Sequence, residues 1–321
     1  MSCAPLRRGD AHLGQPGAPS RDGEAGPLSG AARRGAGRAA TGSRGEVIFT
    51  PGEQRTLAGT AAFEGIGLHT GERCSLRVHE GAAGAGIVFR SGRQKIPAVP
   101  SSVVDTSRGT TLGSGGERVV CVEHLMAALA ICGIDNAVCE VEGPELPAMD
   151  GSALPFCQAF VRVGTCPQGR ERIVRRPDGV ECVTEGASML MASASQAFAA
   201  RYLMRYSHPL IGLQFAEFSE GEDAVERVAP ARTFGLFQEA RELQAKGLAR
   251  GASEENAIIV YDDAIRPPLR FKDELVRHKV LDMLGDIALC GCALRTALFG
   301  VATGHRANVE MARRIVEGKA V

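Results

Sequence analysis

Residues 273–290 constrain the fold of this 321-residue chain most strongly, because they combine a helical apolar pattern with a polar stripe. Apolar side chains recur there at the spacing of a helix, at Leu275, Val276, Val280, Met283, Leu284 and Ile287. Positions i and i+4 stack on one helix face, so His278 and Asp282 lie side by side, with Asp286 one turn further. Gly291 follows as a C-terminal cap. We therefore expect a core helix whose polar stripe faces a ligand or a partner.

The pair His278 and Asp282 provides half of a metal site, and Glu123-His124 upstream is the candidate for the rest. Taken alone, such a stripe is more commonly a solvated face or a row of ion pairs. Hydrolytic zinc sites take three protein ligands and leave a fourth position for water. Two imidazole nitrogens and one carboxylate oxygen suit zinc and also ferrous iron. We therefore take His124, His278 and Asp282 as candidate ligands, and Glu123 as the general base for the bound water.

The composition excludes several classes of protein. The 37 Lys and Arg residues balance the 37 Asp and Glu residues, so a general nucleic-acid binder is not indicated. No window approaches the roughly 20 consecutive apolar residues of a membrane helix, and the start lacks a secretory apolar core. The ten cysteines are scattered and form no Cys-x-x-Cys pair, which is typical of reduced thiols. We expect a cytoplasmic protein with no transmembrane segment and no nucleic-acid partner.

The element pattern divides the chain into three parts. Residues 1–45 are rich in Gly, Ala, Arg, Pro and Ser without apolar periodicity, and we expect them to be disordered. Residues 46–169 and 170–321 are each expected to form an α+β domain. The predicted helices are residues 122–132, 154–163, 238–246, 273–290 and 308–316. The predicted strands include residues 74–79, 86–90, 136–142, 180–183, 188–194, 257–261 and 294–301.

A short internal echo indicates that the two parts are similar. Residues 129–133 (LAICG) resemble residues 287–291 (IALCG), and aligning their final glycines places His124 and Asp282 at equivalent helix positions. The hypothesis is a duplicated α+β unit whose two principal helices face each other and share one site. Five similar positions are few, so the repeated order of elements carries most of this argument.

Two further segments contribute polar groups. His305 stands at a Gly-preceded corner between a predicted strand and helix, a common location for a functional side chain. The alternative is that Asn308 caps the helix and His305 is a surface residue. Residues 63–71 form a glycine-punctuated turn for which no packing role is evident.

Together these segments resemble the UDP-3-O-acyl-N-acetylglucosamine deacetylases of lipid A synthesis in Gram-negative bacteria. Six motifs carry the resemblance, in the family's order: residues 65–71 (GIGLHTG), 122–125 (VEHL), 149–153 (MDGSA), 231–234 (ARTF), 276–286 (VRHKVLDMLGD) and 304–305 (GH). The resemblance implies an α+β fold of two similar domains, each a β-sheet with helices, packed as a sandwich with the active site between them. It also implies a monomer.

The resemblance assigns a role to each polar residue of the predicted centre. His124, His278 and Asp282 would bind a catalytic Zn²⁺, with Fe²⁺ as the possible alternative. Glu123 would be the general base and His305 the general acid.

Five further residues would assist these groups. Asp286 would orient His305, and Thr233 would help to hold the developing oxyanion. Lys279 would contact the diphosphate or hydroxyl groups of the substrate, UDP-3-O-acyl-N-acetylglucosamine. Phe234 and Gly304 would also contact the substrate, and the reaction would release acetate and a free amine.

An apolar passage for the acyl chain is implied near residues 234–262. The candidate lining residues are apolar, and core packing accounts for them equally well: Leu236, Phe237, Leu243, Leu248, Ile258, Ile259 and Val260. The chain departs from the family pattern at three positions. Cys121 replaces a common Thr, and Ala302 stands where members carry Lys or Arg near the diphosphate. Tyr206 is the candidate for the aromatic residue that stacks on uracil.

Two other functions use the same residues. A ferrous oxygenase uses two His and one carboxylate, but it leaves Glu123 and His305 without roles. A non-catalytic sugar-nucleotide binding protein with a structural metal needs a closed site of four protein ligands, and the sequence offers three.

Overall fold

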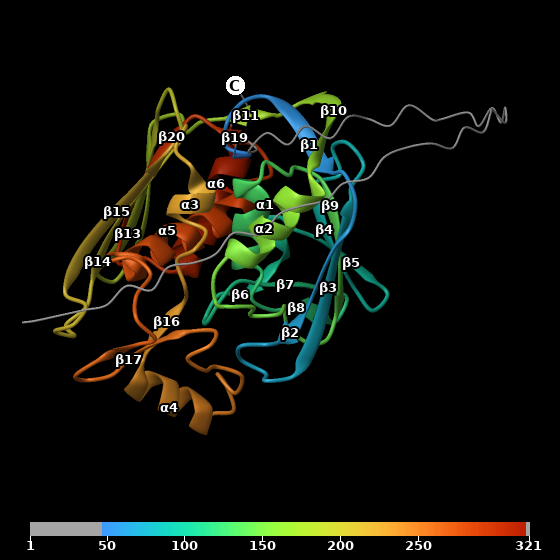
Figure 1. Cartoon of the computed structure of the whole chain (residues 1–321). Helices are drawn as coiled ribbons and strands as arrows, with labels where there is room; N and C mark the ends of the chain where they lie inside the picture. The colour runs from blue at the N-terminus through green and yellow to red at the C-terminus, as the bar shows by residue number, and fades with distance from the viewer. Residues whose placement is uncertain (1–46, 319–321) are drawn as a thin grey trace, which may run out of the picture. The chain divides into compact units, whose positions relative to one another are not determined.

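The computed structural model describes residues 47–318, which lie within a single compact unit (Figure 1). The segment predicted to be disordered, residues 1–45, lies outside the described residues. Helices and strands are mixed along the chain, which confirms the α+β class. Within residues 47–318, no helix has both the length and the apolar character needed to cross a membrane.

The helices and strands have the following bounds. The helices are α1 (Glu123–Ile131), α2 (Leu154–Val163), α3 (Ala224–Arg227), α4 (Phe237–Ala245), α5 (Glu274–Ile287) and α6 (His305–Glu317), with short 3₁₀ turns η1 (Pro100–Ser102) and η2 (Ala288–Cys290). The first ten strands are β1 (Glu53–Leu57), β2 (Ala61–Ile66), β3 (Arg73–Glu80), β4 (Ile87–Ser91), β5 (Gln94–Pro97), β6 (Val103–Asp105), β7 (Thr111–Ser114), β8 (Glu117–Val119), β9 (Ala137–Glu142) and β10 (Thr165–Glu171). The remaining strands are β11 (Val174–Arg175), β12 (Val180–Glu185), β13 (Ser188–Ala194), β14 (Ala199–Arg205), β15 (Leu213–Ser219), β16 (Phe234–Leu236), β17 (Ile258–Val260), β18 (Ile265–Arg266), β19 (Ala293–Leu294) and β20 (Thr296–Val301).

Two five-stranded sheets share one topology. Their strand orders are β2-β3-β9-β4-β5 and β12-β13-β20-β14-β15. In each sheet the central strand is the last one in the chain, antiparallel to one neighbour and parallel to the other. A helix precedes each central strand (α1 and α5) and a second helix follows it (α2 and α6). The prediction of two similar β-sheet-plus-helix halves is therefore confirmed, although β2, β5, β14 and β15 were not predicted.

The helices lie between the two sheets, as Figure 1 shows for α1, α2, α5 and α6. Each sheet presents alternate side chains to them, as in β3, where Leu76 and Val78 are fully buried and pair with Val141 and Cys139. One apolar cluster continues through both halves. The domain boundary predicted near residue 170 stays a prediction.

The two principal helices, α1 and α5, cross at Gly285. A Cβ atom at this position would lie 2.1 Å from the carbonyl oxygen of Glu123, so only glycine allows the helices to approach this closely. At the same crossing His124 Nε2 lies 3.7 Å from Asp282 Oδ1. The two helices that carry the repeated sequence therefore face each other, as the duplication hypothesis requires.

The start of the last helix differs from the prediction. Helix α6 begins at His305 rather than Asn308, and Gly304 occupies its N-cap position. The Asn308 side chain does not cap the helix, because it is buried and donates a hydrogen bond to Asp286. The alternative in which Asn308 is the cap and His305 a surface residue is therefore wrong.

Replacing Gly285 with Ala tests the helix crossing. In an open helix this change stabilises a protein by about 0.5–1 kcal/mol, because Ala loses less backbone entropy. Here we expect destabilisation by about 1–3 kcal/mol, since the methyl group overlaps the Glu123 backbone. Urea unfolding followed by circular dichroism measures the change. Gly179→Ala is the control because its methyl group enters open space. A Gly285→Ala variant as stable as wild type contradicts the close crossing.

Candidate metal centre and active site

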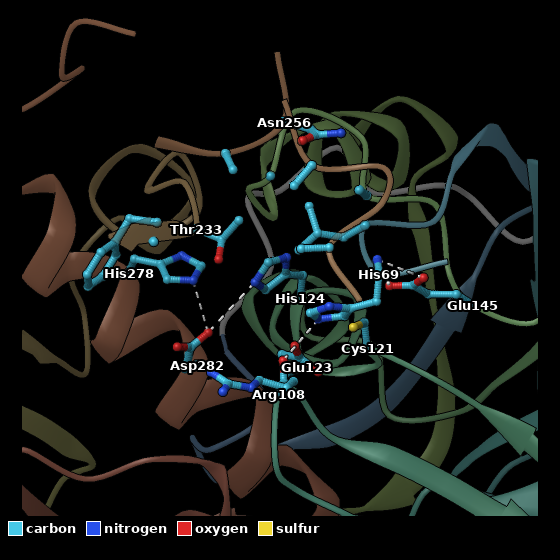
Figure 2. Close-up of a pocket in the computed structure, with 18 of the residues that line it drawn as sticks. His69, Arg108, Cys121, Glu123, His124, Glu145, Thr233, Asn256, His278 and Asp282 are labelled. Atoms are coloured by element: carbon cyan, nitrogen blue, oxygen red, sulfur yellow. Dashed lines mark hydrogen bonds and ion pairs between the residues drawn. The ribbon is translucent and has the colours of Figure 1, made fainter. Parts of the chain in front are cut away.

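The three predicted metal ligands come together between α1 and α5. His278 Nε2 lies 3.2 Å and His124 Nε2 lies 3.7 Å from the same oxygen, Asp282 Oδ1. Their potential ligand atoms all lie within 4.8 Å of one another, and Figure 2 shows the three side chains converging. The i, i+4 spacing on α5 accounts for one pair, and the helix crossing supplies His124.

His278 is held as a neutral imidazole with one nitrogen available. Its Nδ1 lies 3.1 Å from the carbonyl oxygen of Ala231, so Nδ1 carries the hydrogen and Nε2 has a free lone pair. The side chain is 2% exposed, and this burial lowers the pKa of His278 to about 3. A metal ligand needs this neutral form at physiological pH.

Asp282 is a buried carboxylate that stays ionised. Burial alone would raise its pKa, but the adjacent Lys279 ammonium holds the pKa well below its usual range. Lys279 Nζ lies 2.9 Å from Oδ2, which leaves Oδ1 to face the two imidazoles. Lys279 is therefore an ion-pair partner of Asp282 at the wall of the cavity.

The donor atoms fit a divalent transition metal. The bare Nε2 of His278 and the Asp282 oxygen face each other with lone pairs at 3.2 Å, an arrangement that needs a cation or a proton between them. Two imidazole nitrogens and one carboxylate oxygen are a ligand set for zinc or ferrous iron. His124, His278 and Asp282 are the residues that would hold the ion.

Glu123 occupies the first position of α1 and points into the same cavity. The residue is 5% exposed, and its Oε2 accepts a hydrogen bond of 2.8 Å from the Thr110 backbone. A Cβ atom at Gly109 would lie 2.8 Å from Oε1, so a glycine there leaves room for the carboxylate. This single backbone bond fixes the side chain and leaves Oε1 available.

His305 faces the cavity and is paired with Asp286. Its Nδ1 lies 2.9 Å from Asp286 Oδ2, and Asp286 is fully buried. Burial opposes the charged imidazolium, but the charge of Asp286 and its hydrogen bond prevail and raise the pKa of His305 to about 10. His305 is therefore protonated at neutral pH, with Nε2 free to donate.

Thr110 is hydrogen-bonded both to Glu123 and to Asp286, the partner of His305, and its role was not predicted from the sequence. Its backbone N–H binds Glu123, and its hydroxyl donates to Asp286 Oδ1 at 2.5 Å. The residue lies in the loop between β6 and β7, outside every motif. No local pattern marks a loop residue that contacts a side chain 176 positions away.

The predicted substrate-binding residues lie around the same cavity, with one exception. Thr233 lines it, and its backbone is fixed by bonds to Gly151 and Ile258. Phe234 and Tyr206 also line the cavity, with ring centroids 5.8 Å apart. Gly304 is not among the described lining residues and instead caps α6.

The cavity has a volume of about 280 Å³, and part of its wall is apolar. This apolar wall is formed by side chains from both halves: Leu68, Leu125, Leu146, Phe156, Leu243 and Ile259. Of the candidates for an acyl passage, Leu243 and Ile259 line the cavity. The others are placed elsewhere: Ile258 and Val260 are buried in the core, Leu236 packs against it, Phe237 contacts Tyr261 and Leu248 is 38% exposed.

Replacing Asp286 with Asn tests the origin of the His305 charge. The raised pKa means that charged His305 stabilises the fold below its ordinary pKa of 6.5, and that this stabilisation is lost as the pH rises through about 10. In Asp286→Asn we expect the pKa of His305 to fall and the stability to vary less over this range. NMR titration of labelled histidines in metal-depleted protein measures the pKa. Asp273→Asn, at the start of α5, is the control, and an unchanged titration in Asp286→Asn contradicts the pairing.

Comparison with known proteins agrees with this arrangement. Residues 54–317 match the family described as UDP-3-O-acyl N-acetylglycosamine deacetylase (LpxC), whose members are metal-dependent enzymes. Three relatives named UDP-3-O-acyl-N-acetylglucosamine deacetylase each align with 82% of this chain. The protein of Geobacter sp. (strain M21) is 40% identical over 89% of its length, that of Myxococcus xanthus 41% over 86%, and that of Thermosynechococcus vestitus 39% over 94%. The chain therefore belongs to the UDP-3-O-acyl-N-acetylglucosamine deacetylase family.

Proposed function

We propose that this protein hydrolyses the N-acetyl group of UDP-3-O-(3-hydroxyacyl)-N-acetylglucosamine with Zn²⁺, in the committed step of lipid A synthesis. One observation carries the proposal: a single cavity is lined by three potential metal ligands, by the buried carboxylate of Glu123 and by the His305 imidazole, whose pKa is raised to about 10. Together these three components can polarise an amide, deprotonate the attacking water and protonate the leaving nitrogen. We also propose a cytoplasmic monomer, the location on the basis of composition and the oligomeric state on the basis of the family resemblance.

The metal would be held by His124, His278 and Asp282. When bound, Zn²⁺ polarises the amide carbonyl and lowers the pKa of a coordinated water towards about 7. Fe²⁺ satisfies the same ligands, and the donor set does not distinguish the two ions. The charge of Asp282 is shared with Lys279, so the centre keeps a net positive charge for substrate oxygen.

Glu123 and His305 would move the protons. Glu123 accepts a proton from the attacking water through Oε1, because Oε2 is already bonded to Thr110. His305 donates a proton from Nε2 to the departing amide nitrogen, because Nδ1 is bonded to Asp286. The C–N bond then breaks, and the products are acetate and the free amine of the acylated UDP-glucosamine.

Thr233 and Lys279 would complete the polar surroundings. The Thr233 hydroxyl is expected to donate to the developing oxyanion, and donors fixed at this oxygen are usually a large catalytic contribution. Lys279 carries its charge 5.4 Å from the Phe234 ring and would contact the diphosphate or hydroxyl groups. Tyr206, next to Phe234, is the expected partner of the uracil ring.

The two alternative functions would leave some of the polar side chains in the cavity without a role. A ferrous oxygenase has no role for the anchored Glu123 or for the His305–Asp286 pair. A non-catalytic sugar-nucleotide binding protein with a structural metal would close its site with a fourth protein ligand. Within residues 47–318, the group around Asp282 offers three.

Replacing Glu123 with Gln tests the base. We expect kcat to fall by about 10²–10⁴-fold, because a general base contributes this amount, while the metal content stays unchanged. Acetate release and metal analysis measure the two quantities. Glu239→Gln is the matched control, since Glu239 lines the same cavity and has no role in the proposal. A near-wild-type rate in Glu123→Gln refutes the assignment and favours a different mechanism.

Replacing Leu243 with Trp tests the apolar wall as the acyl passage. The larger side chain should raise KM for long-acyl substrates by about tenfold, or roughly 1.4 kcal/mol, and affect short-acyl substrates much less. Kinetics with substrates of graded chain length measure this difference. Leu248→Trp on the surface is the control. An equal effect on all chain lengths would place the acyl group elsewhere.

A further inference from the structure

A second group of potential metal ligands lies in the wall of the cavity. It consists of His69, Cys121 and Glu145, whose ligand atoms all lie within 4.8 Å of one another (Figure 2). His69 follows β2, Cys121 lies between β8 and α1, and Glu145 follows β9. All three line the cavity and are therefore accessible to an ion, and none of them has a role in the proposed reaction.

His69 presents a bare nitrogen to this group. Its Nε2 lies 3.3 Å from the carbonyl oxygen of Arg108, so Nε2 carries the hydrogen. Its Nδ1 is buried and has no hydrogen-bond partner among residues 47–318. A buried polar atom without a partner destabilises the fold, and a bound cation would offset this cost. His278 shows the same arrangement, with one nitrogen on a backbone carbonyl and the other free for a metal.

Glu145 and Cys121 supply the two anionic donors. Glu145 is fully buried, and its Oε2 accepts bonds from the backbone and hydroxyl of Thr70, while the His69 backbone N–H is shared between Oε1 and Oε2. The Cys121 thiol also hydrogen-bonds to this carboxylate, and a metal ion would take the place of the thiol proton between them. Cys121 is a free thiol, and burial, followed by the charges of Glu123 and Glu145, raises its pKa. Without a metal ion the raised pKa favours the protonated thiol. A bound divalent cation favours the thiolate instead, because coordination replaces the thiol proton.

We propose that His69, Cys121 and Glu145 form a second divalent-cation site, separate from the His124–His278–Asp282 centre. The thiolate selects a soft or borderline ion such as Zn²⁺, Co²⁺ or Cd²⁺ over Mg²⁺ or Ca²⁺. The two anionic ligands neutralise the ion, whereas the first centre keeps a net positive charge. Binding releases the thiol proton and joins three segments of the first half. A bound ion therefore stabilises the fold against heat, whatever reaction the first centre performs.

Cobalt titration of the metal-depleted full-length protein tests the site. Only the second site has a sulfur ligand, so a sulfur-to-cobalt charge-transfer band in the near ultraviolet reports on it alone. We expect two equivalents of Co²⁺ to bind, with the band developing for one of them and the melting temperature rising as it develops. Cys121→Ser should lose the band and one equivalent. Cys182→Ser, at an exposed thiol, should keep both.

Two further variants separate this site from the first. His124→Ala should lose one equivalent and the deacetylase activity but keep the band, so failure of the proposed function would not affect this result. His69→Gln should weaken the affinity of the band-forming site by about tenfold or more, and it tests the site independently if Cys121→Ser does not fold. A single equivalent without a band in wild type, or a band that persists in Cys121→Ser, overturns the proposal.

Discussion

The close crossing of α1 and α5 determines where every polar group of the candidate centre lies. Gly285 lets the backbone of Glu123 approach α5, and this contact places His124 opposite Asp282. The two helices are equivalent elements of two sheets with the same topology. Because each half contributes part of the ligand set, neither half alone provides the three ligands. The packing of α1 against α5 therefore also brings the three candidate ligands together.

Two of the buried carboxylates on α5, Asp282 and Asp286, bind different groups of the centre. Asp282 faces the metal ligands and Lys279, while Asp286, one turn further along, binds Thr110, His305 and Asn308. Asp286 is fully buried, and its three donors come from a loop and from the last helix. A buried charge of this kind is tolerated only when its hydrogen-bonding capacity is met. The result is one neutral imidazole at the metal ligands and one protonated imidazole across the cavity.

Local patterns predicted the parts of this arrangement that depend on helix periodicity. The stripe from His278 to Asp282 and the bounds of α2 follow from spacing and capping, and the structure agrees with both. The hydrogen bonds of Thr110 and the meeting of Glu145 with His69 and Cys121 depend on loops that come together only after folding, so local sequence patterns do not reveal these contacts. The start of α6 was misplaced because the side chain of Asn308 binds Asp286 instead of capping the helix. For the apolar residues near 234–262, the sequence pattern is the same for side chains that face the core and for those that face the cavity. Only the packing in the structure shows that Leu243 lines the cavity and Ile258 lies in the core.

The central claim is that this centre hydrolyses an acetamide with a bound metal ion. Acetate release from UDP-3-O-acyl-N-acetylglucosamine tests it most directly, measured on metal-depleted protein before and after addition of one equivalent of Zn²⁺. The account predicts no release before addition and, after it, acetate and free amine in equal amounts, with or without oxygen. Release by the metal-depleted protein, no release by the zinc-loaded protein, or a requirement for oxygen would contradict it.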